Sequence, residues 1–142
     1  MKLAIDSSVF ISHLGQNDEF SSDSKLFFTT IFEQKEKIII PTLIIAETLT
    51  ILRQQNHPSL KPIYKTFNDF NIIDLDSKFL EKFVNLLLKQ HTNMKTSDLA
   101  IAATAKFNES TLITWDRKIL TSAKSICPIL TPKQYIEQTK SN

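Results

Sequence analysis

The segment KIIIPTLIIAETL, residues 37–49, decides the fold, because it changes from a strand pattern to a helix pattern within one residue. Three β-branched residues in a row, Ile38–Ile40, favour a short buried strand. Pro41 follows, and proline suits the start of a helix, where its missing N–H costs nothing. We expect that helix to run to about Gln55. A strand that leads directly into a helix is the repeating unit of α/β proteins.

The same alternation continues on both sides of this segment. Apolar runs predict strands at residues 2–6, 38–40, 71–75, 111–114 and 128–130. Helices are predicted at residues 7–14, 22–37, 41–55, 58–70, 77–91, 96–107 and 116–124, and from residue 132 onward. Strands separated by helices pair in parallel, and short unalternating strands are covered on both faces. We therefore expect a three-layer α/β/α sandwich with a parallel, roughly five-stranded sheet.

Local signals predict how some helices begin or are interrupted. Ser7 is expected to cap the helix at residues 7–14, and Thr96 or Ser97 the helix at residues 96–107. Pro62 is expected to disturb the helix at residues 58–70.

Length and composition bound the class of protein. The 142 residues, 42% of them hydrophobic, suit one domain over residues 1–142, with polar residues 138–142 expected to fray. A net charge of +2 permits nucleic-acid binding without requiring it. With Gly15 as its only glycine, the chain cannot build the glycine-rich loops that cradle nucleotide phosphates.

The cellular setting follows from cysteine usage and from the N-terminus. Cys127 is the only cysteine, so it forms no internal disulfide, which fits a reduced, cytoplasmic location. Asp6 interrupts the first apolar run, which makes that run a poor signal peptide. No apolar stretch is long enough to span a membrane, so no membrane partner is expected.

Four acidic residues stand in apolar surroundings where an ionised carboxylate is costly unless it is compensated. Asp6 ends the first strand, and Asp116 follows Leu112-Ile113-Thr114-Trp115. Glu47 and Asp98 are the only charges in their stretches, residues 41–52 and 96–105. Asp98 and Asp116 could each be a helix cap, but Glu47 lies in the middle of a helix, where no cap explains it.

The expected topology brings the four acids to one place. Sites in open parallel sheets form beyond the carboxyl ends of the strands, where helix N-termini also point. Four converging carboxylates repel one another, so a cation is needed among them. Oxygen ligands without cysteine or histidine select Mg²⁺ or Mn²⁺ rather than zinc. Such a site polarises a phosphoryl oxygen and activates water, which predicts phosphodiester hydrolysis.

The four motifs resemble those of PIN-domain ribonucleases, and more narrowly VapC toxins of toxin–antitoxin pairs. The motifs are Asp6-Ser7-Ser8, PTLIIAETL around Glu47, KTSDLAIAATA around Asp98 and LITWDRKI around Asp116, and the likeness spans residues 2–130. The resemblance implies a Mg²⁺- or Mn²⁺-dependent endoribonuclease that leaves 5′-phosphate and 3′-hydroxyl ends. It also implies a homodimer neutralised by an antitoxin.

The resemblance assigns roles to further residues. Ser8 and Thr114 match small polar positions that orient a metal ligand or water; alternatively, Ser8 caps a helix and Thr114 is a plain strand residue. Lys95 and Arg117, with Lys118, either contact RNA phosphate or are simply solvated. Trp115 either stacks a base or packs against the sheet.

The remaining candidates are given structural interpretations. His13, His57 and His91 lie near helix ends without metal-ligand spacing, so no site role is expected for them. Phe79, Phe83, Leu86 and Leu87 share a helix face that serves either the core or a dimer interface. Two other functions remain open: a housekeeping PIN nuclease in RNA maturation, and a PIN-like interaction module without turnover.

Overall fold

The computed structural model describes residues 1–141 and contains one parallel sheet with the strand order β3-β2-β1-β4-β5. The strands are β1 (Lys2–Ile5), β2 (Lys37–Pro41), β3 (Asn71–Ile73), β4 (Thr111–Ile113) and β5 (Ile129–Leu130). β1 lies at the centre, where Ala4 pairs with Ile39 of β2 on one side and with Leu112 of β4 on the other. The predicted five-stranded parallel sheet is confirmed.

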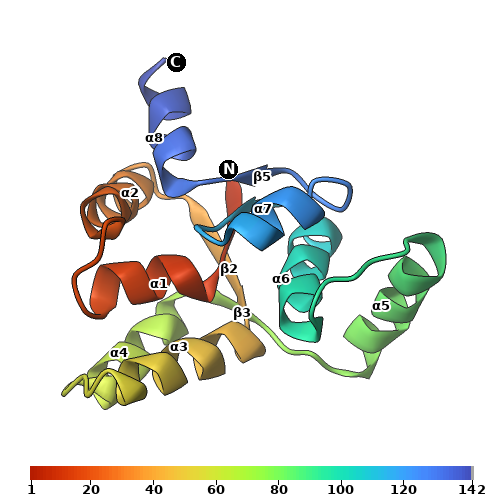
Figure 1. Cartoon of the computed structure of the whole chain (residues 1–142), viewed down its shortest axis with the longest axis horizontal. Helices are drawn as coiled ribbons and strands as arrows, with labels where there is room; N and C mark the ends of the chain where they lie inside the picture. The colour runs from red at the N-terminus through yellow and green to blue at the C-terminus, as the bar shows by residue number, and fades with distance from the viewer. Residues whose placement is uncertain (142) are drawn as a thin grey trace.

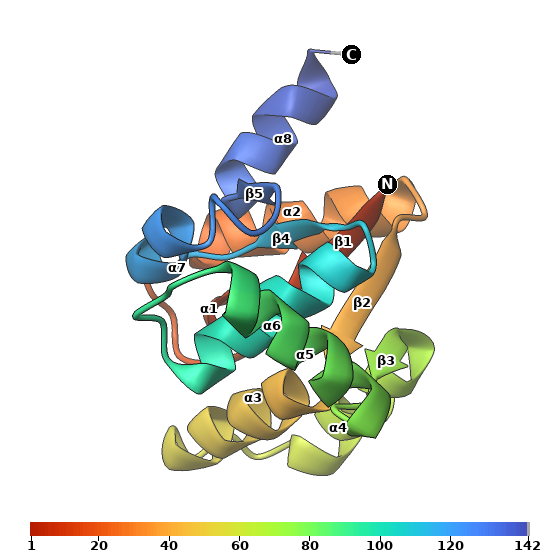
Figure 2. The same ribbon diagram turned by 90° about the vertical axis from the view of Figure 1, so that its right-hand side faces the viewer.

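Helices cover both faces of this sheet. They are α1 (Ser7–Leu14), α2 (Ser21–Glu33), α3 (Thr42–Gln54), α4 (Leu60–Thr66), α5 (Ser77–Lys89), α6 (Thr96–Phe107), α7 (Arg117–Ser122) and α8 (Pro132–Lys140), with a 3₁₀ turn η1 at Phe67–Asp69. Figure 1 shows α1 and α2 on one side of the strands and α6 on the other, with α5 outside α6. Figure 2 shows α8 projecting from the body of the molecule. The predicted three-layer arrangement is therefore also confirmed.

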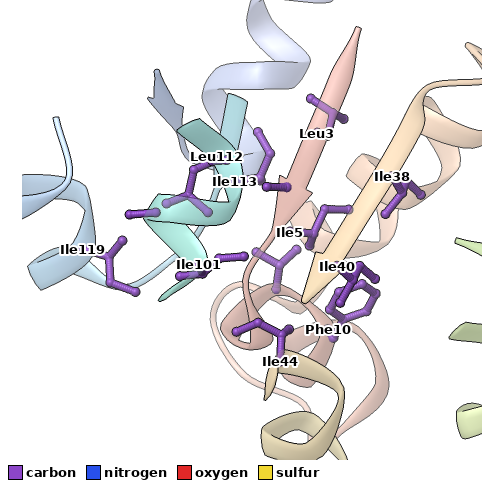
Figure 3. Packing of buried hydrophobic residues seen from close by; sticks show 14 of the residues in the cluster. Leu3, Ile5, Phe10, Ile38, Ile40, Ile44, Ile101, Leu112, Ile113 and Ile119 are labelled. Atoms are coloured by element: carbon purple, nitrogen blue, oxygen red, sulfur yellow. The ribbon is translucent and has the colours of Figure 1, made fainter. Parts of the chain in front are cut away.

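The central strands are apolar throughout because both of their faces are buried. Leu3, Ala4 and Ile5 of β1 are fully buried, as are Leu112 and Ile113 of β4. Figure 3 shows these strand residues packing with side chains of α1, α3, α6 and α7. The sheet is therefore a rigid base from which residues at the strand ends project.

Several predicted helix boundaries were wrong. Pro41 is the last residue of β2 and the N-cap of α3, not a residue inside the helix. Ser7 lies inside α1, whose cap is Asp6, and α6 is preceded by Lys95 rather than capped by Thr96 or Ser97.

Two predicted segments also differ from the structure. The helix predicted at residues 58–70 is shortened to α4 and then tightens into η1; Pro62 lies in the first turn of α4, where proline is tolerated. The chain predicted to fray from Gln138 continues as helix to Lys140, while Asn142 lies outside the described residues. Within the described part, no helix is long and apolar enough to cross a membrane.

Candidate active site

Asp6 lies at the carboxyl end of the central strand, held against the neighbouring strand β4. Its backbone N–H donates to the carbonyl of Ile113 at 2.9 Å, and its side chain is only 4% exposed. One carboxylate oxygen, Oδ2, accepts from the hydroxyls of Ser8 at 2.7 Å and Thr114 at 2.8 Å. Within the described residues, no hydrogen bond reaches the other oxygen, Oδ1, which leaves that oxygen for an external ligand.

The two hydroxyls are themselves fixed by backbone groups. Ser8 Oγ accepts from the N–H of Trp115 at 3.1 Å, and Thr114 Oγ1 accepts from the N–H of Asp116 at 2.9 Å. Because an ionised carboxylate can only accept, each hydroxyl donates its proton to Asp6. Ser8 and Thr114 therefore orient Asp6 through direct contact.

Burial nevertheless dominates the ionisation of Asp6. It raises the pKa of this carboxyl, while the hydrogen bonds from Ser8 and Thr114 lower it; the negative charge of Glu47 raises it further. An ionised Asp6 is thus held in place without any counter-charge large enough to offset its burial. Such an environment favours a bound cation.

Glu47 lies in the second turn of α3, which starts directly after β2. Its Oε2 accepts a hydrogen bond of 2.6 Å from the hydroxyl of Ser7. The sequence analysis predicted only a helix-cap role for Ser7, and its contact with Glu47 was missed, although its position directly after Asp6 is the signal that could have found it. Consecutive residues of α1 therefore fix two acids, Ser7 holding Glu47 and Ser8 holding Asp6.

Asp98 and Asp116 face the same space from two helix starts. Asp98 lies in the first turn of α6, and Asp116 is the N-cap of α7, where its Oδ1 accepts from the N–H of Lys118 at 2.7 Å. Burial and the charges of Asp116 and Glu47 raise the pKa of Asp98, although Lys95 and Lys118 oppose that shift. Asp116 is thus a helix cap, which was one of the two interpretations of the sequence, and its negative charge also acts on Asp98.

Three of the four acids line one hollow of about 440 Å³ at the carboxyl edge of the sheet. It is lined by Glu47, Lys95, Ser97, Asp98, Asp116, Arg117 and Lys118. Asp6 is not part of this lining, but it lies next to Glu47, because the adjacent residues Ser7 and Ser8 donate to Glu47 and Asp6 respectively. Among the described residues, no three Asp, Glu, His or Cys side chains stand close enough to form a ready-made ion site. We call this space the acid hollow.

Other candidate residues have structural surroundings. The indole of Trp115 stacks on Phe20 with ring centroids 4.5 Å apart, and its Nε1–H donates to Ser24 Oγ at 2.8 Å. Trp115 thus packs against the protein. His13 packs on the Phe28 ring at 4.6 Å. None of the three histidines lines the acid hollow.

The predicted apolar face of α5 is divided between core and solvent. Phe79 and Leu86 are buried and Phe83 is half-buried, while Leu87 is 44% exposed. The core therefore takes part of this face, and Leu87 turns away from it.

An open parallel sheet with acidic residues gathered at its carboxyl edge defines a class of α/β domain built for chemistry at that edge. A model of the PIN domain family matches residues 3–124. The chain belongs to the PIN domain family. No curated protein matches it in sequence.

Solved structures share this fold at low sequence identity. A toxin–antitoxin complex from Klebsiella pneumoniae has a TM-score of 0.67 at 19% identity, covering 92% of this chain and 97% of that one. VapBC2 from Rickettsia felis, bound to a promoter DNA fragment, has 0.64 at 16%, covering 92% and 98%. The sarcin-ricin loop cleaving toxin VapC20 of Mycobacterium tuberculosis has 0.65 at 11%, covering 83% and 92%. At these identities the likeness shows the fold.

Proposed function

We propose that this protein is a Mg²⁺- or Mn²⁺-dependent endoribonuclease. The observation that carries the proposal is the acid hollow: Glu47, Asp98 and Asp116 line it with Asp6 beside it, and burial together with the neighbouring carboxylates raises the pKa of Asp6 and Asp98. Carboxylates that repel one another and have no ion-pair partner are stabilised by a bound cation. A bound divalent cation attracts and activates a phosphodiester substrate.

The donor set fits a hard divalent ion. The lining of the acid hollow offers carboxylate and hydroxyl oxygens and contains no histidine or cysteine, which favours Mg²⁺ or Mn²⁺ over zinc. Asp6, through its Oδ1, and Asp98 are the residues we assign as direct ligands. Glu47 and Asp116 complete the set. Oδ1 of Asp116 already accepts a hydrogen bond from the N–H of Lys118, which caps α7.

The residues around the acids prepare the reaction. A bound divalent ion supplies a polarised phosphoryl oxygen and a water of lowered pKa. Ser8 and Thr114 hold Asp6, and Ser7 holds Glu47, so the acids stay oriented without rearrangement. Water adds to phosphorus and the 3′ oxygen leaves, which gives 5′-phosphate and 3′-hydroxyl ends. Lys95 and Arg117, both exposed at the rim, are placed to hold flanking phosphates.

We further propose that the enzyme is the toxin of a toxin–antitoxin pair in the cytoplasm. The fold it shares with the VapBC2 and Klebsiella pneumoniae complexes supports this assignment. The antitoxin would lay a peptide or helix across the acid hollow. The genomic neighbourhood tests this role. A reading frame for a small antitoxin beside this one would support the toxin, and its absence would favour a housekeeping nuclease of RNA maturation.

A homodimer is part of the same proposal, and α5 supports it. Leu80, Val84, Leu87 and Leu88 are between 44% and 80% exposed and recur at helical spacing on one face. An exposed apolar row of this kind is typical of protein interfaces. We expect Val84→Lys to convert a dimer into a monomer in light scattering, while the matched surface change Thr29→Lys on α2 leaves the mass unchanged.

The proposed activity is tested with purified protein and single-stranded RNA. We expect cleavage with Mg²⁺ or Mn²⁺, none in excess chelator, and none by an Asp98→Asn variant that keeps the wild-type circular dichroism. Cleavage that persists in chelator contradicts the metal mechanism. Retained cleavage of DNA without cleavage of RNA contradicts the substrate assignment. A folded protein that cleaves neither is an interaction module.

A further inference from the structure

A second hollow of about 440 Å³ adjoins the acid hollow on the side of α7. It is lined by Asn93, Met94, Lys95, Asp98, Arg117, Lys118, Ile119, Thr121 and Ser122. Lys95, Asp98, Arg117 and Lys118 line both hollows, so the two form one continuous depression. We call the second space the flanking hollow.

The two halves of the depression differ in charge. The acid hollow sets three carboxylates against the three cations Lys95, Arg117 and Lys118. The flanking hollow contains the same cations but only one carboxylate, Asp98. A polyanion that leaves the acid hollow therefore meets an excess of positive charge in the flanking hollow. This asymmetry favours extension of a nucleic-acid backbone from the acid hollow into the flanking hollow.

The floor and wall of the flanking hollow suit a nucleobase rather than a bare phosphate. Met94 is half-buried against the core and offers apolar surface, and Ile119, only 2% exposed, lies beneath it. Asn93 and Ser122 are exposed, and neither side chain makes a hydrogen bond to any described residue. An amide and a hydroxyl above an apolar floor provide both donors and acceptors for the edge of a base.

Local hydrogen bonds shape both walls of the flanking hollow in the absence of a ligand. The loop before α6 is held by a hydrogen bond of 3.1 Å from the N–H of Met94 to Thr92 Oγ1. On the other wall, Asp116 caps α7, and Thr121 Oγ1 donates to the carbonyl of Arg117 at 2.9 Å. A preformed wall loses little conformational entropy when it binds a ligand.

We infer that the flanking hollow is a base-recognition subsite, which binds the nucleotide next to the scissile phosphate of a single-stranded RNA. Asn93 and Ser122 contact the edge of the base, Met94 contacts its face, and the cations contact its phosphates. The inference rests on the proposed ribonuclease function and adds to it the residues that determine sequence preference. It makes Asn93 and Ser122 specificity residues without a part in the chemistry.

The inference is tested by equilibrium binding, which does not depend on turnover. Fluorescence anisotropy is measured with four labelled RNA homohexamers and the wild-type chain, Asn93→Ala and Ser122→Ala, in metal-free buffer. We expect the wild type to prefer one base, and each variant to reduce that preference by about threefold to tenfold, the value of one net hydrogen bond. The control variants Asn68→Ala and Ser22→Ala change exposed residues of the same types elsewhere and should retain the preference.

Cleavage mapping on an RNA with randomised positions separates failure of this inference from failure of the proposed function. We expect the Asn93→Ala variant to lose base preference at one position adjacent to the cut while it still cleaves with metal. Cleavage with an unchanged preference at every position overturns the subsite but leaves the nuclease intact. Base-selective binding without cleavage overturns the nuclease and leaves the subsite. The inference is overturned if the wild type binds all four homohexamers with the same affinity. It is also overturned if a hexaglutamate peptide binds as tightly as RNA and Asn93→Ala weakens the binding of both to the same extent.

Discussion

The two ends of the sheet each carry a hollow, and only the hollow at the amino end contains an acid with an ion-pair partner. The hollow at the amino end is the larger, about 690 Å³, and Lys2, Lys35, Glu36 and Lys37 are among its lining residues. Glu36 and Asp69 are the acids of its lining, and Glu36 is paired with the terminal ammonium of Met1 and accepts from the Tyr135 hydroxyl at 3.0 Å. We call it the amino-end hollow.

At the carboxyl end the acids lack such partners. The pair formed by Met1 and Glu36 is the only ion pair in the described part of the chain, so none of the four site acids is neutralised by a lysine or arginine. Instead, burial and mutual repulsion raise the pKa of Asp6 and Asp98. The carboxyl end thus differs from the amino end in two ways: none of its acids has an ion-pair partner, and the pKa of two of them is raised. Each prediction below changes one end and compares it with the other.

Removing one charge at the carboxyl end should have the largest effect. We expect Asp6→Asn to lower the rate of RNA cleavage by more than about a hundredfold, beyond the loss typical of residues that only support a ligand. Asparagine preserves the shape and the contacts with Ser8 and Thr114, so the fold should be retained. Asp69→Asn, which changes an acid of the amino-end hollow, is the matched control and should cleave at the wild-type rate. Equal losses in both variants would refute the assignment.

Loss of one orienting hydroxyl should have a smaller effect. Thr114→Val removes the donor to Asp6 and the acceptor for the N–H of Asp116, so we expect metal affinity and cleavage to fall about tenfold to a hundredfold. Thr114→Ser keeps the hydroxyl and should recover most of the activity. Calorimetric titration with Mn²⁺ measures the affinity. If Thr114→Val and Thr114→Ser bind Mn²⁺ alike, the hydroxyl has no orienting role.

At the amino end, removing the charge should affect stability and not catalysis. Glu36→Gln breaks the pair with the Met1 ammonium and weakens the hydrogen bond from Tyr135. We expect the free energy of unfolding in urea to fall by about 1 kcal/mol. The cleavage rate of the folded variant should equal that of the wild type, and a large loss of cleavage would place function at this end as well.

Acidification should stabilise the metal-free protein. Because the pKa of Asp98 is raised in the fold, the folded chain binds this proton more tightly than the unfolded chain does. Stability therefore increases as the pH falls from above the raised pKa toward the ordinary value of 3.8. Asp98→Asn should flatten this rise, and saturating Mg²⁺ should reverse it. Thermal melts across this pH range check the sign. The prediction is contradicted if the melting temperature of the wild type shows the same dependence on pH as that of Asp98→Asn.

The smallest change is expected from the rim cations. Lys95→Ala should weaken RNA binding and lower the slope of log affinity against log salt by roughly 0.7, the value for one phosphate contact on a single strand. Lys35→Ala in the amino-end hollow should leave the slope unchanged. Identical slopes in all three proteins would show that Lys95 is only solvated.

The sheet could be predicted, and the four acids could be selected as candidate site residues, because each depends on local pattern. Strands buried on both faces are apolar throughout, and an acid directly after such a strand, as at Asp6, can only lie at the sheet edge. Glu47 was also identified from local pattern, in its case as a single charge in the middle of an apolar helix. Local pattern was therefore sufficient for the architecture and for which acids to examine.

Helix ends were harder to predict because the chain has a single glycine. Helices commonly end at a glycine with positive φ, but here Lys35, Asn56 and Glu109 adopt that conformation after α2, α3 and α6, with φ of 54°, 57° and 51°. A lysine or glutamate at such a position gives no signal in the sequence. This explains why the helix predicted at residues 22–37 was too long.

The contacts that orient the acids could not be predicted because they join distant parts of the chain. Ser7 reaches Glu47 across 40 residues, and Thr114 reaches Asp6 across 108. The Trp115 indole is held by Ser24, 91 residues away, which decided between a base-stacking and a packing role. Such pairings depend on the register of the strands and on how α1, α2 and α3 pack.

The central claim is that the carboxyl end of the sheet holds a divalent cation, and a crystal soaked in Mn²⁺ tests it most directly. We predict anomalous density in contact with Asp6 and Asp98, next to Glu47 and Asp116, and its loss from crystals of Asp98→Asn. Well-diffracting crystals of a cleavage-competent protein that show Mn²⁺ elsewhere, and none among these carboxylates, would contradict the claim.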